Sequence, residues 1–347
     1  MNASTDDTGT DRRLNVLITG GAGFIGSHLA DMHLQKGDSV TIVDNLSTGS
    51  LRNIAGFRQH PDLQFHKADI LYWEGIDDAM HWADRVYHMA AVVGVKKVLS
   101  DPRVVMATNI AGTERIFRVA SLANPDIEMI IPSSSEVYGF SGKPFFSESD
   151  DIVLRPLDHH RWIYAVSKLA DEYLAMAYRK HSAAKVVVVR LFNTVGPNQT
   201  GRYGMVVPTF ISQAVAGEPL TIYGNGHQTR SFCDVRDTVV ALDRLACNPQ
   251  AQGEIVNVGS DAERSIRELA ELIVERAGSS SPLRFISYAD AYGEHFEDHM
   301  HRRPDIRKLH SLTGFWHHWQ FNDTLDDLIL RERERRAVQD HTVGVDG

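Results

Sequence analysis

The sequence predicts an α/β fold with a doubly wound parallel sheet, and two features carry this prediction. Short runs rich in valine and isoleucine alternate with segments whose apolar residues recur at helical spacing. The first pair is the run 14–20 and the helical pattern 24–37, which stops at Gly37. Strands and helices in alternation form a parallel sheet with helices on both faces, so we expect one such central sheet.

The same alternation continues along the chain as far as about residue 195. Further strands are predicted at 39–45, 63–70, 85–91, 127–135 and 184–193, with helices at 105–123 and 162–181. Beyond this point the sequence becomes rich in glycine and polar residues, and an amphipathic helix is expected at 264–278. The change in pattern indicates a smaller, mixed α/β part in the C-terminal half.

These patterns divide the chain into four segments. Residues 1–13 are expected to be disordered, and 331–347 form a disordered or frayed tail. Residues 14–195 form the sheet-containing domain. Residues 196–330 form the smaller part, with some chain crossing back to the sheet, and we expect it to cover a cleft at the carboxyl ends of the strands.

Composition and charge limit the class of protein. The 347 residues include 43% hydrophobic and 23% charged residues, which is ordinary for a globular protein with a sizeable core. The net charge of −9 argues against nucleic acid as a partner, because nucleic-acid-binding proteins usually carry a basic face. The apolar runs are too short to span a membrane, and the polar N-terminus does not resemble a signal peptide.

Cysteine usage indicates the compartment. The chain has two cysteines, Cys233 and Cys247, and neither they nor the 17 histidines show the spacing of a metal site. Two thiols in a chain of this length are typical of a reducing environment. We therefore expect a cytoplasmic protein without a bound metal.

A glycine-rich stretch joins the first predicted strand to the first predicted helix. Gly20, Gly23 and Gly26 are spaced three residues apart in LITGGAGFIGSHLA. One glycine permits a tight turn, another lets the backbone approach a pyrophosphate, and the third lets the helix pack on the strand. The first N–H groups of the helix would then face the phosphates. A plain turn is the alternative, but this context favours a Rossmann-type dinucleotide site.

Asp44 ends the second predicted strand and points to the identity of the dinucleotide. A carboxylate here can accept hydrogen bonds from the adenosine ribose and would repel a 2′-phosphate, so NAD is favoured over NADP, although Arg52 lies nearby in the sequence. Asp69, after the third strand, is expected to reach the adenine amino group or, alternatively, to cap a helix. Contacts on the ribose side are also expected from Asn45, Ser47 and Gly49.

Tyr164 and Lys168 lie four residues apart in the predicted helix 162–181, one turn apart on the same face. A free tyrosine has a pKa near 10 and is a poor base at neutral pH. A neighbouring ammonium and the positive nicotinamide ring favour the phenolate. A phenolate can take a proton from a sugar or alcohol hydroxyl while hydride leaves the carbon. The alternative is a packing tyrosine beside a solvated lysine.

Polar residues follow the predicted strand at 127–135, in the sequence PSSSEVYG. Side chains at the carboxyl end of such a strand face the ligand crevice of a doubly wound sheet. Ser134 can donate a hydrogen bond to the reacting oxygen, and Glu136 adds a second titratable group. A turn serine and a surface glutamate are the alternatives, but the neighbouring motifs favour catalysis.

Taken together, these segments resemble the extended short-chain dehydrogenase/reductase family, in its nucleotide-sugar branch. The resemblance covers about residues 14–330 and rests on TGGAGFIGSHL, DNLSTG, YHMAA, SSSEVYG, YAVSK, RLFNTVGP, GEPLTIYGNGHQTRSF and RRPDIRK. It implies a UDP-sugar substrate whose C4 hydroxyl is oxidised to a 4-keto intermediate by a retained NAD. It also suggests a homodimer through a four-helix bundle formed by the helices near 105–123 and 162–181.

The resemblance implies roles for individual residues. Ser134, Tyr164 and Lys168 match the catalytic triad of the family. Asn193 and Arg230 match contacts to the nucleotide sugar. The positive charge that a nucleoside diphosphate needs would come from Arg230 together with Arg302. Other cofactor contacts are expected from Phe24, Ile25, Ile70 and Ala90, and another substrate contact from Ser135.

Two reactions remain open for the 4-keto sugar. Ser134 is followed by Ser135 and Glu136, so the Asp-Glu pair of the 4,6-dehydratases is missing. Ser-Glu at this place resembles UDP-glucuronate decarboxylases, in which an arginine at the position of Arg302 would hold the carboxylate or help to protonate the enolate. The stretch 200–208 instead resembles a UDP-glucose or UDP-glucuronate 4-epimerase. We expect a decarboxylase ahead of an epimerase.

A non-catalytic NAD sensor or scaffold is the alternative from another class. Fold alone cannot separate such a protein from an enzyme. Sensors commonly lose the tyrosine or the lysine of the triad, whereas this chain has Ser134, Tyr164 and Lys168. The sequence therefore favours an enzyme.

Overall fold

A seven-stranded parallel sheet forms the centre of the computed structural model, which describes residues 12–94, 100–154, 156, 162–201, 204–292 and 299–343. The strand order is β11-β6-β5-β4-β1-β2-β3. The strands are β1 (Asn15–Thr19), β2 (Ser39–Asp44), β3 (Leu63–Lys67), β4 (Arg85–His88), β5 (Glu128–Ser134), β6 (Lys185–Leu191) and β11 (Ile255–Val258). The order reverses direction between β1 and β4, where ligands of such sheets bind at the carboxyl ends.

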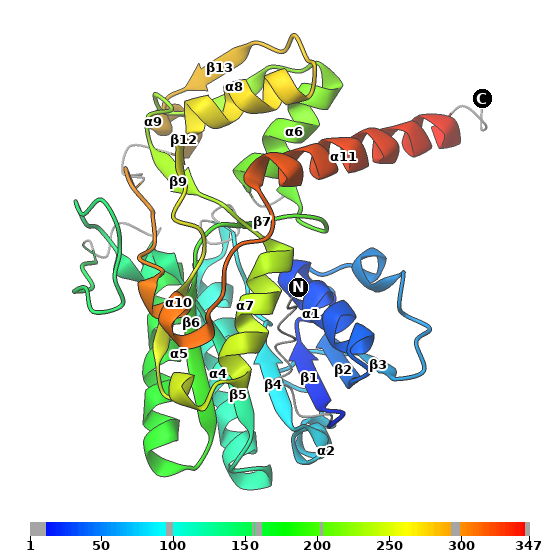
Figure 1. Ribbon diagram of the computed structural model, residues 1–347, viewed down its shortest axis with the longest axis vertical. Helices are drawn as coiled ribbons and strands as arrows, with labels where there is room; N and C mark the ends of the chain where they lie inside the picture. Colours follow the sequence, from blue (N-terminus) through cyan, green and yellow to red (C-terminus); the bar gives the residue numbers. More distant parts are fainter. Residues whose placement is uncertain are drawn as a thin grey trace, which may run out of the picture.

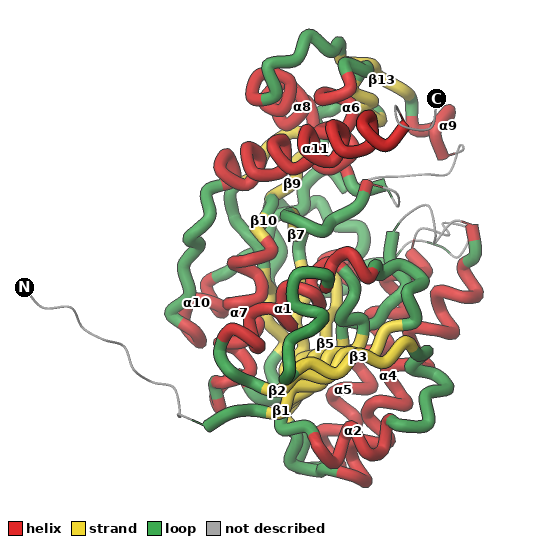
Figure 2. Tube along the Cα trace, turned by 90° about the vertical axis from the view of Figure 1, so that its right-hand side faces the viewer, coloured by secondary structure: helices red, strands yellow, loops and turns green. Residues whose placement is uncertain are grey.

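Helices cover both faces of the sheet, which lies between two helical layers in Figure 2. One layer holds α1 (Phe24–Gln35), α7 (Val235–Cys247) and α10 (Arg307–Thr313). The opposite layer holds α2 (Ile76–Trp82), α4 (Pro102–Ala123) and α5 (Trp162–His181). Because both faces are covered, the strands are apolar on both sides, and Val16, Leu17 and Ile18 of β1 are all fully buried.

The chain after residue 195 forms a smaller mixed α/β part beyond one end of the sheet, at the top of Figure 1. Its helices are α6 (Val206–Ala216), α8 (Ile266–Arg276), α9 (Tyr288–Tyr292) and α11 (Phe321–Val343). Three two-stranded ladders pair β7 (Thr194–Val195) with β10 (Cys233–Asp234), β9 (Thr229–Ser231) with β12 (Glu263–Ser265), and β8 (Leu220–Tyr223) with β13 (Leu283–Ile286). Short 3₁₀ helices occur at η1 (Leu51–Ile54), η2 (Ser135–Tyr138) and η4 (Pro249–Ala251).

The predicted elements agree with the observed ones, and the fold class is confirmed. The predicted strands 63–70 and 85–91 end earlier than expected, at Lys67 and His88, because the residues that follow turn into loops at the carboxyl edge. Chain beyond residue 195 returns to the sheet as β11, α7 and α10. The domain boundary at residue 195 stays a prediction.

The C-terminal end of the chain differs from its predicted description. Helix α11 continues to Val343, so a frayed tail from residue 331 is wrong as far as this residue. Ion pairs of Glu332 with Arg335 and Arg336 support the helix here. The predicted disorder of residues 1–13 falls mostly outside the described residues, which begin at Arg12.

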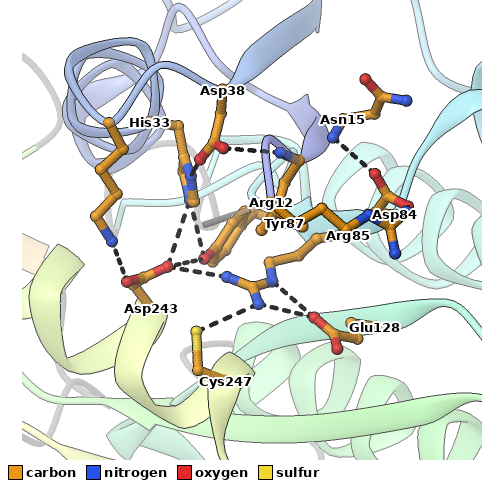
Figure 3. A network of polar contacts seen from close by, with 12 residues as sticks. Arg12, Asn15, His33, Asp38, Asp84, Arg85, Tyr87, Glu128, Asp243 and Cys247 are labelled. Atoms are coloured by element: carbon orange, nitrogen blue, oxygen red, sulfur yellow. Dashed lines mark hydrogen bonds and ion pairs between the residues drawn. The ribbon is translucent and has the colours of Figure 1, made fainter. Parts of the chain in front are cut away.

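A buried polar network joins β4 to helices α1 and α7 (Figure 3). Arg85 Nη1 donates to Asp243 Oδ1 at 2.9 Å, and Arg85 Nη2 donates to Glu128 Oε2 at 2.8 Å. His33 bridges Asp38 and the Tyr87 hydroxyl at 2.7 and 3.1 Å. Arg85 is at the first residue of β4, so this network stabilises the end of the sheet opposite the carboxyl edge.

Candidate active site

A cavity of about 580 Å³ extends from the carboxyl ends of the parallel strands into the smaller C-terminal part. Its volume and position are those of a ligand site at the switch point of a doubly wound sheet. Nearly all of the predicted site residues line it: Gly20, Gly23, Phe24, Ile25, Gly26, Asp44, Asn45, Ser47, Asp69, Ile70, Ala90, Ser134, Ser135, Glu136, Tyr164, Lys168, Asn193, Arg230 and Arg302. Gly49 is the exception among the predicted residues.

The glycine-rich turn brings backbone close to backbone, as a dinucleotide site requires. Gly20 adopts a φ of +69°, and a Cβ there would lie 2.7 Å from the backbone nitrogen of Ala90. A Cβ on Gly23 would lie 2.9 Å from the Gly20 carbonyl oxygen, and one on Gly26 would overlap the same oxygen. Helix α1 starts next to this turn, and no side chain caps its N-terminus. These observations fit the pyrophosphate of a bound dinucleotide.

Asp44 is fixed at the end of β2 by two backbone donors. Its carboxylate accepts from the N–H groups of Ala22 and Leu46 at 3.0 and 2.7 Å. Burial raises the pKa of Asp44, although these two donors oppose the shift. Gly49 lies outside the cavity, and a Cβ on it would lie 2.8 Å from Asp44 Oδ2. Gly49 therefore packs against the Asp44 carboxylate from outside the cavity. The predicted contact of Gly49 with the ribose stays a prediction.

Asp69 lines the cavity and also closes a turn. Its Oδ1 accepts from the Leu71 N–H at 2.9 Å, as a turn-capping carboxylate does. Its Oδ2 accepts from Asn45 Nδ2 at 2.9 Å, and both side chains line the cavity. The adenine contact of Asp69 stays a prediction.

Tyr164 and Lys168 both line the cavity from helix α5, and Lys168 is only 4% exposed. Burial raises the pKa of Tyr164 and outweighs the opposing effect of the Lys168 charge. The Lys168 ammonium therefore favours the phenolate of Tyr164, as expected, but this effect is smaller than the opposing effect of burial. A positive nicotinamide ring would act in the same direction as Lys168.

Sequence reasoning did not identify Asp171. Its position three residues after Lys168 in the same helix is the spacing of an ion pair and could have indicated it. Lys168 Nζ donates to Asp171 Oδ2 at 2.8 Å, three residues along the same helix. Burial disfavours the charged lysine, but Asp171 and Tyr164 outweigh it, so the pKa of Lys168 is raised. Lys168 thus keeps its charge in a buried place, where it can act on the neighbouring phenol.

The turn after β5 presents Ser134 and Glu136 to the cavity. Ser134 Oγ accepts from the Glu136 N–H at 3.2 Å and caps the short helix η2. Burial raises the pKa of Tyr164, and the nearby Ser134 side chain is one of the groups that oppose this shift. The predicted triad of Ser134, Tyr164 and Lys168 is thus assembled from two elements distant in sequence.

A positively charged group lies opposite this turn. Arg302 Nη1 donates to Glu136 Oε1, and Arg302 Nη2 donates to Asn193 Oδ1. Arg302 and Glu136 are largely buried, with 14% and 16% of their side-chain surfaces exposed. Arg230 Nη1 donates to the carbonyl oxygens of Thr229 and His299 at 2.7 and 2.9 Å. The cavity can therefore hold an anionic ligand between its two arginines and the triad.

His88, the last residue of β4, is buried and also lines the cavity. Its ring nitrogens contact the hydroxyls of Thr19 and Thr113 at 2.7 and 3.2 Å, and it lines the cavity. Burial, with a smaller effect of Lys168, lowers the pKa of His88 to about 3. The ring is therefore neutral at physiological pH.

Neither a metal-binding cluster nor a membrane-spanning helix occurs among the residues that the structure describes. In those ranges, no three or more His, Cys, Asp or Glu side chains gather as they would around a metal ion. None of the helices described here has both the length and the apolar content of a membrane span.

Comparisons with known proteins agree with this geometry. The chain is 36% identical over 323 residues to a UDP-N-acetyl-alpha-D-glucosaminuronate decarboxylase of Bacillus cytotoxicus, covering 92% of this chain and 97% of that protein. It is also 36% identical over 306 residues to UDP-glucuronic acid decarboxylase 1 of Xenopus tropicalis, covering 87% of this chain and 68% of that protein.

A solved structure shows the same arrangement of elements. This chain superposes on the UDP-glucuronic acid 4-epimerase of Bacillus cereus with a TM-score of 0.82 at 26% identity. That structure is of a mutant in complex with UDP-4-deoxy-4-fluoro-glucuronic acid and NAD. The match covers 93% of this chain and all of that one. The family model that describes the NAD dependent epimerase/dehydratase family matches residues 16–259. This chain therefore belongs to the NAD-dependent epimerase/dehydratase family.

Proposed function

We propose that the protein is a UDP-hexuronate decarboxylase, with UDP-glucuronate as its first candidate substrate. One observation carries the proposal: Glu136 and Arg302 form a largely buried ion pair that lines the cavity together with the triad tyrosine. An arginine next to the reacting end of a cavity can bind the carboxylate of a uronic acid. The names of both decarboxylase relatives support the same reaction class.

Each side chain of the site has a role in the proposed reaction that follows from its position. NAD⁺, held by the glycine-rich turn and Asp44, would supply the hydride acceptor and later the hydride donor for the sugar C4. Tyr164 accepts the proton of the C4 hydroxyl, and Ser134 holds that oxygen through its own hydroxyl. Lys168 lowers the free energy of the phenolate and holds the nicotinamide ribose. Arg302 orients the carboxylate, and Arg230 with Asn193 binds the nucleotide diphosphate.

A UDP-sugar 4-epimerase is the second candidate, because a solved 4-epimerase of UDP-glucuronic acid shares the fold. That reaction would use the same triad but would keep the carboxylate. A sensor or scaffold is disfavoured, because Ser134, Tyr164 and Lys168 meet in one cavity.

Product analysis separates these functions. The purified protein with NAD⁺ is incubated with UDP-glucuronate, UDP-N-acetylglucosaminuronate and UDP-glucose, and products are identified by mass and proton NMR. We expect a product lighter by one CO₂ from a uronate. An epimer of unchanged mass would instead establish the second candidate, and no turnover of any substrate would favour the sensor.

The proposed assembly is a homodimer in the cytoplasm. Helices α4 and α5 carry large exposed side chains that a second copy would cover: Leu122 is 79% exposed and Tyr173 is 71% exposed. Sedimentation equilibrium should give twice the chain mass for the native protein and a smaller mass for the Tyr173→Glu variant. A native monomer would contradict the dimer, and recovery outside the cytosolic fraction would contradict the compartment.

A further inference from the structure

His299 is a buried neighbour of Glu136 that does not itself line the cavity. Its side chain is 2% exposed, and its Nε2 atom is 3.5 Å from Glu136 Oε2, an ion-pair distance when the ring is protonated. The other oxygen of Glu136 is held by Arg302. Glu136 lines the cavity whereas His299 does not, so the histidine meets the glutamate from the side away from the substrate.

The position of His299 is fixed by one neighbour on the helix that carries Tyr164 and by one that lines the cavity. Its ring lies edge-on to Trp162, with centroids 5.3 Å apart and planes at 88°. Trp162 is the first residue of α5, two residues before Tyr164. The carbonyl oxygen of His299 accepts from Arg230 Nη1 at 2.9 Å. The ring of His299 is thus held against helix α5, and its backbone carbonyl is held by Arg230, which lines the cavity.

The stoichiometry of the proposed decarboxylation shows why a second proton donor is needed. When the bond from C5 to the carboxylate breaks, its electron pair passes into an enolate over C5, C4 and O4, and CO₂ leaves. C5 must then take up one proton that ends in the product. Tyr164 only borrows the proton of the C4 hydroxyl and gives it back when C4 is reduced. Each turnover therefore consumes one proton from solution, unlike epimerisation.

Among the described charged groups that contact Glu136, the imidazole of His299 is a better proton source than the guanidinium of Arg302. An arginine guanidinium such as that of Arg302 is a poor acid at neutral pH. Histidine exchanges protons readily in this pH range. Lys168 is separated from this task by its ion pair with Asp171.

We propose that His299 supplies, through Glu136, the proton that reaches C5 after CO₂ has left. The inference rests on the proposed decarboxylase function. The protonated imidazole gives its Nε2 proton to the glutamate, the glutamate gives a proton to C5, and the neutral imidazole is recharged from solvent. His299 is a positioning and proton-supplying residue, since it acts on the substrate only through Glu136.

The test is a single-turnover measurement on the NAD-loaded enzyme with UDP-glucuronate, following reduced nicotinamide by absorbance and CO₂ by trapping. The His299→Gln variant keeps a donor at the Nε2 position but cannot titrate. Its absorbance should rise at the wild-type rate, because C4 oxidation does not need His299. Its decay should be at least about tenfold slower, because hydride can return only after C5 is protonated.

His301→Gln is the matched control, because His301 lies two residues away, is 45% exposed and pairs with Glu263. Both phases should stay at wild-type rates in this variant. A normal decay in His299→Gln would overturn the inference, and so would an equal slowing of both phases. If His299→Gln does not fold, His299→Asn, whose amide matches Nδ1 and cannot reach Glu136, must show the same slow decay.

The result with the wild-type enzyme separates the proposed decarboxylase function from the proposed role of His299. A wild-type enzyme that releases no CO₂ from UDP-glucuronate overturns the proposed function and, with it, the need for the second proton. A wild-type enzyme that releases CO₂ while the His299 variants behave normally overturns the role of His299 alone.

Discussion

Replacing Asp243 by asparagine should lower the stability of the fold without changing the chemistry. Asp243 Oδ1 accepts from Arg85 Nη1 at 2.9 Å and from the Tyr87 hydroxyl at 3.3 Å, while its Oδ2 pairs with Lys36. The side chains of Arg85 and Asp243 are 4% and 11% exposed. The Asp243→Asn substitution removes the charge that balances this buried arginine (Figure 3).

The magnitude follows from what remains after the substitution. Removing one partner of a buried ion pair costs about 3–5 kcal/mol. Arg85 keeps Glu128, to which it donates from Nε and Nη2 at 2.9 and 2.8 Å, and an asparagine oxygen can still accept one bond. We therefore expect a loss of about 2–3 kcal/mol, or a melting temperature lower by about 3–4 °C for a chain of this size.

The pH dependence gives a second check on the same network. Burial disfavours the ionised carboxylate, but Lys36, His33 and Arg85 outweigh it, so the pKa of Asp243 is lowered. A lowered pKa in the folded state gives stability that is present above the unfolded value, near 3.9, and is lost as the pH falls through the folded value. The difference between wild type and Asp243→Asn should therefore shrink below about pH 4.

The assay is thermal unfolding of both proteins between pH 7 and pH 3, with turnover of UDP-glucuronate measured at 25 °C. Glu271→Gln is the control, because its pair with Arg267 is 3.6 Å long and about half exposed. The control should lose less than about 0.5 kcal/mol. An Asp243→Asn variant that melts with the wild type, or a difference that persists at acidic pH, would refute the reasoning.

Three further predictions concern the active site. Gly26→Ala should weaken NAD binding at least about tenfold in a fluorescence titration, because its methyl would overlap the Gly20 carbonyl oxygen at the pyrophosphate turn; unchanged affinity would contradict this. Tyr164→Phe should fold and bind NAD but lose about 10²–10⁴-fold in kcat, and normal turnover would remove the assigned role. Lys168→Met should shift the alkaline rise of kcat to higher pH, because the pKa of Tyr164 rises further when the charge is lost; an unshifted profile would contradict this.

Sequence reasoning predicted the sheet and most of the site because both depend on local signals. Alternation of strands and helices indicates a parallel sheet, and the carboxyl ends of such strands meet at one edge. The motifs around Gly20, Ser134 and Tyr164 were therefore expected to converge, and the structure brings them into one cavity.

The parts that were missed depend on contacts between distant segments or on burial. Nothing near His299 in the sequence indicates Glu136, and the pair forms only when the segment after α9 returns to β9 and η2. The raised pKa of Tyr164 reflects burial, which spacing alone does not reveal. The close approach of Gly49 to the carboxylate of Asp44 is likewise a tertiary contact, and the predicted ribose-side contact of Gly49 stays a prediction.

The most direct test of the proposed function uses UDP-glucuronate labelled with ¹³C in its carboxylate. The purified protein with NAD⁺ should convert the label into ¹³C-bicarbonate, visible by carbon NMR, and leave a UDP-pentose. The Tyr164→Phe variant should release almost none over the same time. Label that stays entirely in a UDP-hexuronate, with or without inversion at C4, would contradict the decarboxylase.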